Sequence, residues 1–131
     1  MNKIRVIKDR CTSCGICEMV CSITKNGVLN PKQSRIRVKE MFPIPGYPEV
    51  CTQCKNPLCK KACSVDAIEN NNSGTVLVSY GKCIKCMKCV EACPFGTMFV
   101  DIHDGKPIKC DLCNGDPQCV RYCPTGALIY K

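Results

Sequence analysis

Residues 83–94 read CIKCMKCVEACP, so four cysteines follow the spacing C-x2-C-x2-C-x3-C and a proline comes directly after the last one. Three thiolates this close together on a looping backbone can reach three metal atoms of one cluster. A single C-x2-C pair fits zinc ribbons and redox dithiols equally well. The full quartet with its proline is typical of iron–sulfur ligands and is therefore the strongest local signal in the chain.

The same pattern occurs four times and uses all 16 cysteines. The second and fourth quartets lengthen the middle spacing, and each carries a proline two residues before its third cysteine. Zinc prefers two separated C-x2-C pairs, and a disulfide framework does not need this repeated spacing. We therefore predict four [4Fe–4S] clusters, with zinc and disulfides as the weaker alternatives. The quartets are Cys11, Cys14, Cys17 and Cys21; Cys51, Cys54, Cys59 and Cys63; Cys83, Cys86, Cys89 and Cys93; and Cys110, Cys113, Cys119 and Cys123.

The rest of the composition agrees with a metal-loaded protein. A chain of 131 residues buries a limited core, and such chains often need metals or disulfides for stability. Residues 1–8 contain no apolar run like that of a secretory signal, and no stretch approaches the roughly 18 apolar residues of a membrane-spanning helix. We therefore expect a cytoplasmic protein with no direct membrane insertion.

The formal net charge of +8 would ordinarily suggest an anionic partner such as nucleic acid. That sum treats every cysteine as neutral. Coordinating thiolates at all 16 cysteines, offset by four cluster cores of about +2 each, bring the net charge close to zero. Tryptophan is absent and 5% of the residues are aromatic, so base-stacking surfaces are scarce. We therefore predict no nucleic-acid binding.

Short alternating segments between the quartets predict strands, and two turn-rich segments predict tight turns. The turns lie at residues 70–74, which read NNNSG, and at residues 103–106. The predicted strands are at residues 4–7, 36–38, 67–69, 75–78, 97–100 and 127–130.

The order of strands and quartets predicts how the units are arranged. A bacterial ferredoxin begins and ends with strands that pair, and residues 36–102 contain that pattern around quartets two and three. Residues 1–35 plus 103–131 contain it again in two pieces. We therefore predict an α+β fold of two ferredoxin-like two-cluster units, one nested inside the other, with short helices and small antiparallel hairpins. Pairing of sequential quartets is the alternative, but it would separate the two chain ends that look like partner strands.

The fourth cysteine of each quartet ligates the partner cluster in two-cluster ferredoxins. We expect this cysteine to begin a helix and to project away from the other three. Applied to nested pairs, the rule gives four ligand sets. Set 1 is Cys11, Cys14, Cys17 and Cys123; set 2 is Cys110, Cys113, Cys119 and Cys21; set 3 is Cys51, Cys54, Cys59 and Cys93; and set 4 is Cys83, Cys86, Cys89 and Cys63.

The ordered quartets, with KCDLC at residues 109–113 and CPTGAL at residues 123–128, resemble the four-cluster electron-transfer subunit of the dimethyl sulfoxide reductase family. The resemblance covers nearly the whole chain and implies the nested pairing as well. Quartet two departs from the family at Ser64, where proline is common, and at Gln53, where histidine is common. The chain also ends at Lys131 without the extension of many relatives, so it resembles the compact branch of the family.

The resemblance implies a cytoplasmic, anaerobic electron-transfer subunit with no catalytic residues of its own. Its partner would be a larger catalytic subunit, above all a tungsten or molybdenum enzyme of the aldehyde oxidoreductase kind, with a flavin protein or a ferredoxin as the other redox partner. Hydrogenases, formate dehydrogenases and carbon monoxide dehydrogenases have similar subunits. A free-standing polyferredoxin and a zinc-stabilised interaction module stay open as alternatives.

Several other residues carry weaker expectations. Lysines in or beside the ligand loops are expected mainly as solvated counter-charge, although they could also raise cluster potentials or steer an acidic partner. His103 falls in a turn while all quartets are complete, so we do not expect it to be a ligand. Residues 41–48 predict a rigid apolar loop, and residues 42–47 within it are the best candidate for contact with a partner, beside the inner unit. The lysines in or beside the ligand loops, for which counter-charge is expected, are Lys82, Lys85, Lys88 and Lys109.

Overall fold

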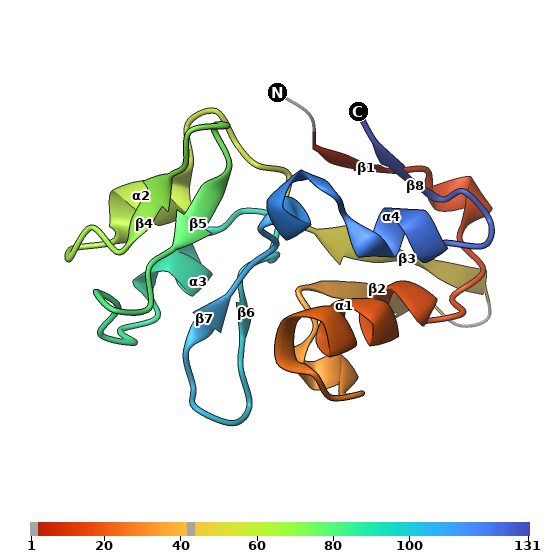
Figure 1. Ribbon diagram of the computed structural model, residues 1–131, viewed down its shortest axis with the longest axis horizontal. Helices are drawn as coiled ribbons and strands as arrows, with labels where there is room; N and C mark the ends of the chain where they lie inside the picture. Colours follow the sequence, from red (N-terminus) through yellow and green to blue (C-terminus); the bar gives the residue numbers. More distant parts are fainter. Residues whose placement is uncertain (1–2, 42–43) are drawn as a thin grey trace.

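The computed structural model describes residues 3–41 and 44–131 and shows a small α+β protein built from short elements (Figure 1). Its strands form four two-stranded antiparallel sheets. The elements are β1 (Ile4–Val6), η1 (Lys8–Arg10), α1 (Ile16–Asn26), η2 (Pro31–Gln33), β2 (Ile36–Met41), β3 (Ile44–Val50), α2 (Leu58–Ala62), β4 (Ile68–Asn70), β5 (Val76–Val78), α3 (Lys88–Ala92), β6 (Phe99–Val100), β7 (Pro107–Ile108), η3 (Leu112–Gly115), α4 (Gln118–Tyr122) and β8 (Leu128–Tyr130).

Strand β1 near the N-terminus pairs with β8 near the C-terminus, as the alternating apolar residues at both ends predict. The register places Ile4 opposite Tyr130 and Val6 opposite Leu128, so apolar side chains face the same core. Helices α1 and α4 pack on each other beside this ribbon (Figure 1). Segments at opposite ends of the sequence therefore build one lobe of the molecule.

The second lobe contains α2, α3 and the β4–β5 hairpin, on the left of Figure 1. The expected turn at residues 70–74 is confirmed, because the Asn71 backbone N–H donates to the Thr75 carbonyl at 2.9 Å and the Asn71 side chain accepts from the Thr75 N–H. The turn at residues 103–106 is confirmed as well, and it joins β6 to β7.

The predicted pairing of residues 36–38 with residues 97–100 is wrong. Strand β2 pairs with β3, and β6 pairs with β7. Both observed partners follow closely along the sequence, so a hairpin closes a much shorter loop than the expected pairing would. The two segments still touch through side chains, since the Arg37 guanidinium carbon lies 4.4 Å from the centre of the Phe99 ring.

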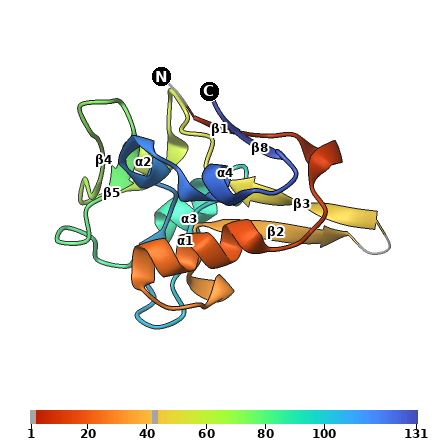
Figure 2. The ribbon, with the colours of Figure 1, turned by 45° about the vertical axis from the view of Figure 1, so that its right-hand side comes forward.

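Residues 44–50 form strand β3, so the prediction of a rigid loop over residues 41–48 is wrong for that part. Phe42 and Pro43, which were also part of the expected contact loop, lie outside the described residues. The β2–β3 hairpin packs on α1, β1 and η1, although the sequence analysis assigned it to the inner unit. The Gly46 backbone N–H donates to the Ser13 hydroxyl at 2.6 Å, and the Lys8 ammonium lies 4.2 Å from the Tyr47 ring centre. The hairpin therefore sits beside quartet one and reaches out past α1 (Figure 2).

The two lobes have separate apolar cores. One core gathers side chains from β1, β8, the β2–β3 hairpin and quartets one, two and four, including Ile36 and Leu112, each 1% exposed. The other lies between β4, β5 and α3 and includes Ile68 and Val76. Cysteines contribute to both cores, so the ligand loops are part of the packing. No helix of the described residues is long and apolar enough to cross a membrane.

Candidate metal centres

Each quartet opens with a loop that directs a backbone amide at its first sulfur. The N–H two residues after the first cysteine donates to that Sγ at 3.4 Å in all four loops. Each donor residue adopts a left-handed backbone, which is uncommon for residues other than glycine. Such a bond favours the thiolate form that binds metal, so the repeated strain fits a ligand role. The donors are Ser13 (φ 59°), Gln53 (φ 51°), Lys85 (φ 59°) and Leu112 (φ 59°).

A short helix links the third and fourth cysteines of each quartet. The third cysteine is the second residue of its helix, as Cys17 is in α1. The expectation that the fourth cysteine begins a helix is wrong, because Cys63, Cys93 and Cys123 follow the last helical residue and Cys21 lies inside the longer α1. Proline after Cys93 and Cys123 accounts for two of these ends, since a residue before proline is disfavoured in a helix.

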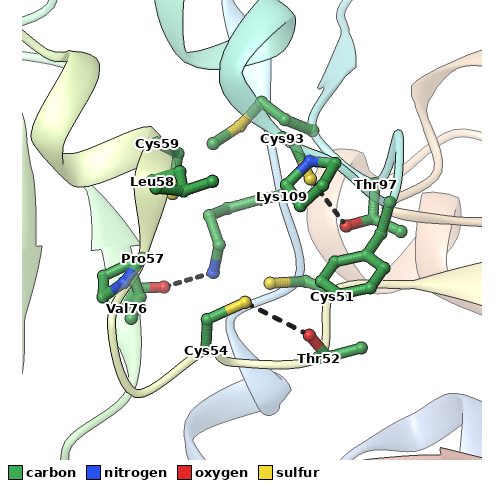
Figure 3. A pocket seen from close by; sticks show the side chains of 13 residues that line it. Cys51, Thr52, Cys54, Pro57, Leu58, Cys59, Val76, Cys93, Thr97 and Lys109 are labelled. Atoms are coloured by element: carbon green, nitrogen blue, oxygen red, sulfur yellow. Dashed lines mark hydrogen bonds between the residues drawn. The ribbon is translucent and has the colours of Figure 1, made fainter.

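Three cavities of the protein are each lined by four cysteines, and each group of four is one of the expected sets. Figure 3 shows the cavity of set 3, where Cys51, Cys54 and Cys59 of quartet two face Cys93 from the end of α3. The cavity of set 4 is lined by Cys63 together with Cys83, Cys86 and Cys89. The cavity of set 2 is lined by Cys21 together with Cys110, Cys113 and Cys119.

The cysteines of set 1 are brought together less completely. The thiols of Cys11 and Cys14 lie close enough to Cys17 to influence its pKa. Cys123 follows α4, which packs on α1, the helix that carries Cys17. Within the described residues, no three His, Cys, Asp or Glu side chains converge as they would around a single ion. The sulfurs of the other sets surround voids instead, which is the space that a polyatomic cluster needs.

The thiols at third positions are held mainly in their protonated form. Desolvation raises the pKa of Cys17 to about 12, with Glu18 adding to the effect, and raises that of Cys89 to about 11. Burial acts in the same direction on Cys93, but bonds from the Thr97 hydroxyl and nearby backbone amides outweigh it and lower the pKa. Metal loading must therefore displace protons from the third positions.

Thiols of neighbouring sets lie close enough to influence one another's pKa. Desolvation is the main cause of the raised pKa at three buried thiols, two in set 2 and one in set 4, and a thiol of the neighbouring set adds to it. Such an influence requires proximity, so set 1 adjoins set 2, set 2 adjoins set 3, and set 3 adjoins set 4. The pairs are Cys17 acting on Cys119, Cys51 acting on Cys110, and Cys59 acting on Cys89.

A hydrogen-bonded ring lies where set 2 adjoins set 3. The Gln53 amide nitrogen donates to the Cys110 carbonyl at 2.9 Å, and its oxygen accepts from the Val76 N–H at 2.9 Å. The Lys109 ammonium donates to the same Cys110 carbonyl at 2.8 Å and also to the Val76 carbonyl. Lys109 and Gln53 are each 4% exposed, and Lys109 lines the cavity of set 3 (Figure 3).

Solvated counter-charge is therefore the wrong interpretation of Lys109, although it fits the other three lysines, which are exposed. Sequence reasoning gave Gln53 no role beyond a departure from the family pattern. The sequence feature that could have identified Gln53 is its position two residues after Cys51, where its backbone N–H donates to the sulfur. Its side-chain amide can also donate and accept hydrogen bonds at the same time. His103 is exposed in the β6–β7 turn and lines none of the three cysteine cavities.

Four repeated cysteine loops, each with a backbone amide that donates to its first sulfur, and the cavities lined by their cysteines define an iron–sulfur protein of the ferredoxin class. Residues 44–131 match the family model described as a 4Fe-4S dicluster domain, and residues 8–26 match a 4Fe-4S binding domain. The protein belongs to the 4Fe-4S dicluster family of electron-transfer proteins. It carries several [4Fe–4S] clusters, and its 16 cysteines suffice for four.

Relatives with functional names are similar over most of the sequence. The polyferredoxin-like subunit of aliphatic sulfonate oxidoreductase from Pyrococcus furiosus is 40% identical over 92% of this chain and 70% of its own length. The B subunit of polysulfide reductase from Wolinella succinogenes is 28% identical over 94% of this chain and 72% of its own length. A solved structure of the active-site complex BamBC of benzoyl coenzyme A reductase contains a polypeptide with a TM-score of 0.60 and 26% identity, covering 100% of this chain and 75% of that one. The resemblance to iron–sulfur subunits of the dimethyl sulfoxide reductase family is confirmed.

Proposed function

We propose that this chain is the electron-transfer subunit of a larger oxidoreductase complex and passes single electrons through four [4Fe–4S] clusters. The observation that carries the proposal is the order of the cysteine sets in the packing, because Cys17, Cys110 and Cys51 of sets 1, 2 and 3 share one core, and Cys59 and Cys89 of sets 3 and 4 share the other. Cys14 in set 1 and Cys86 in set 4 are the two exposed cysteines, and they belong to the first and last sets of that order. A series of sites with accessible ends and a buried middle suits a relay.

The proposal includes ligation across quartets, so that each set of four cysteines holds one cluster. The three cavities lined by sets 2, 3 and 4 support it, because each contains one cysteine from a different quartet. When bound, the clusters supply the one-electron chemistry. The residues supply position, amide bonds to sulfur and exclusion of water.

Nesting of one two-cluster unit inside the other is part of the same proposal. The sequence analysis divides the chain into residues 1–35 plus 103–131 outside and residues 36–102 inside, and we keep this division except for the hairpin of residues 36–50. Pairing of β1 with β8, packing of α1 on α4, and packing of α2 on α3 support this division. We assign the hairpin of residues 36–50 to the outer unit, because it packs on α1 and β1.

The catalytic partner is proposed to be a tungsten or molybdenum enzyme of the aldehyde oxidoreductase kind, in the cytoplasm of an anaerobic cell. Relatives that are named as subunits of sulfonate and polysulfide oxidoreductases support a catalytic partner in general. We place it at the end of the relay marked by Cys14, beside the β2–β3 hairpin. The Ser13–Gly46 bond fixes the hairpin to the ligand loop there, so a partner held by one would be aligned with the other. A flavin protein or ferredoxin would exchange electrons at the opposite end.

Anaerobic affinity purification of the tagged full chain from its own cell tests the proposal. We expect a catalytic subunit of several times its mass to co-purify, with bound tungsten or molybdenum in stoichiometric amount. A chain that elutes alone and exchanges electrons with several unrelated enzymes at similar rates would instead be a free-standing polyferredoxin. Co-purification of a nickel or flavin enzyme without tungsten or molybdenum would keep the relay but contradict the assigned partner.

A further inference from the structure

Residues 80–88, here called the basic loop, surround the more accessible end of set 4. The loop reads YGKCIKCMK and contains three lysines and no acidic residue. Its Cys86 is exposed, and Ile84 beside it is 61% exposed although it also lines the cavity of set 4. The loop therefore presents an apolar side chain next to a ligand sulfur, with positive charge around both.

Carboxylates near the basic loop leave its positive charge in excess. The Lys82 ammonium lies 3.7 Å from Glu69, and both side chains are about half exposed, so this pair is weak. Within residues 3–41 and 44–131, no carboxylate lies within ion-pair distance of the other two lysines of the loop. The Lys106 ammonium also lies beside the loop, 4.6 Å from the centre of the Tyr80 ring, but it pairs with Asp104 at 3.3 Å, so the excess charge rests on the lysines of the loop itself.

The other accessible end of the relay has a different character. Around Cys14, residues 8–18 mix basic and acidic side chains, and Lys8 is engaged over Tyr47. Ser13 in that loop is held by the hairpin. The two ends therefore suit two kinds of contact, one with a structured neighbour and one through charge.

We propose that the basic loop is the docking face for a small acidic redox protein that exchanges electrons with set 4. This inference rests on the proposed function, because it assigns the partner at one end of the relay. The partner would carry carboxylates around a small apolar contact that meets Ile84 and the 41% exposed Tyr80. In each encounter one electron leaves the reduced protein and reduces the other, and no bond forms or breaks. Charge sets the rate of such encounters, while the small area keeps them brief.

The test compares two triple variants with equal net charge. The first replaces the lysines of the basic loop, and the control replaces exposed lysines elsewhere on the protein. Iron content and visible absorption are matched before use, so that lost clusters do not mimic lost docking. The docking variant is Lys82→Gln, Lys85→Gln and Lys88→Gln, and the control variant is Lys32→Gln, Lys55→Gln and Lys131→Gln.

Stopped-flow mixing with a reduced, acidic plant-type [2Fe–2S] ferredoxin gives the second-order rate at several ionic strengths. We expect the wild-type rate to fall as salt rises, and the docking variant to be slower by at least about tenfold at low salt, with little salt dependence. The control should stay within about twofold of the wild type. A basic c-type cytochrome, used as oxidant of the reduced protein, should show the opposite trend.

A wild-type rate that does not fall with salt would overturn the proposal even if the docking variant fails to fold. Equal rates for the docking and control variants would overturn it as well. Failure of the proposed function has another signature. In that case neither protein partner exchanges electrons with the fully loaded wild-type chain, although dithionite still reduces its clusters.

Discussion

Replacing Lys109 with methionine should lower the reduction potentials of the clusters in sets 2 and 3. The side chain is 4% exposed, lines the cavity of set 3 and donates to the carbonyl of Cys110, a cysteine of set 2. Reduction adds one negative charge to a cluster, so a buried ammonium nearby favours the reduced state. Methionine has a similar length but no charge, and it removes that stabilisation.

The size of the effect follows from Coulomb's law. A unit charge about 10 Å from a cluster, at an effective dielectric constant of about 20, changes the energy of one added electron by about 1.7 kcal/mol. At 59 mV for each tenfold change in a one-electron equilibrium, this corresponds to a fall of roughly 70 mV. The variant should also unfold more easily, by about 1–3 kcal/mol, because the Val76 carbonyl loses its Lys109 donor while the Cys110 carbonyl keeps Gln53.

Redox titration followed by electron paramagnetic resonance would measure the shift in the fully loaded protein. The matched control is Lys61→Met on α2, an exposed lysine two residues from Cys59, for which solvent screening should keep the shift small. Lys109→Arg retains the charge and should keep the potentials near those of the wild type. Unchanged potentials in Lys109→Met, with all clusters present, would refute the argument that this ammonium acts on the clusters.

Three further predictions follow from the sites and their junction. Cys93→Ser should disturb the cluster of set 3 and spare that of set 4, with a loss of up to about four irons by metal analysis. Cys89→Ser should disturb set 4 and spare set 3. Damage to the same set by both changes would contradict ligation across quartets. Anaerobic protein should contain about 16 irons and 16 sulfides, and removing them with a chelator should unfold the protein, as measured by circular dichroism, because metal binding and folding are coupled. Gln53→Leu should lower the free energy of unfolding by about 1–3 kcal/mol, since it leaves the buried Val76 N–H without its acceptor while the Cys110 carbonyl keeps Lys109. Gln118→Leu, at a side chain that bonds to nearby Asp116, should change it by less than about 1 kcal/mol.

The cysteine spacing predicted the four ligand loops, because short covalent distances hold three cysteines of each quartet near one another. The β1–β8 pairing was predictable for a similar reason, since both ends carry alternating apolar residues and need a partner. The β4–β5 hairpin was predictable from its asparagine and glycine turn. These features depend on local chemistry, which a sequence displays directly.

The β2–β3 hairpin was missed because its second strand contains Pro45 and Pro48, which argue against a strand inside a sheet. In a two-stranded ribbon both strands are edges, so a proline can face away from the ladder. The burial of Lys109 was missed because lysine is almost never fully buried unless paired. Its partners here are backbone carbonyls from β5 and quartet four, which no local pattern connects to it.

These missed residues explain how the two lobes are held in register. Their apolar cores are separate, so packing alone leaves the lobes weakly joined. The ring of Gln53, Val76, Lys109 and Cys110 contains four hydrogen bonds, and two of them, from Gln53 to Cys110 and from Lys109 to Val76, join the lobes. Each side chain of the ring binds the same two backbone positions, so a shift of one lobe would break both of these bonds at once. The junction between sets 2 and 3, where an electron must pass from one lobe to the other, is therefore fixed by polar bonds whose loss would be costly in a buried place.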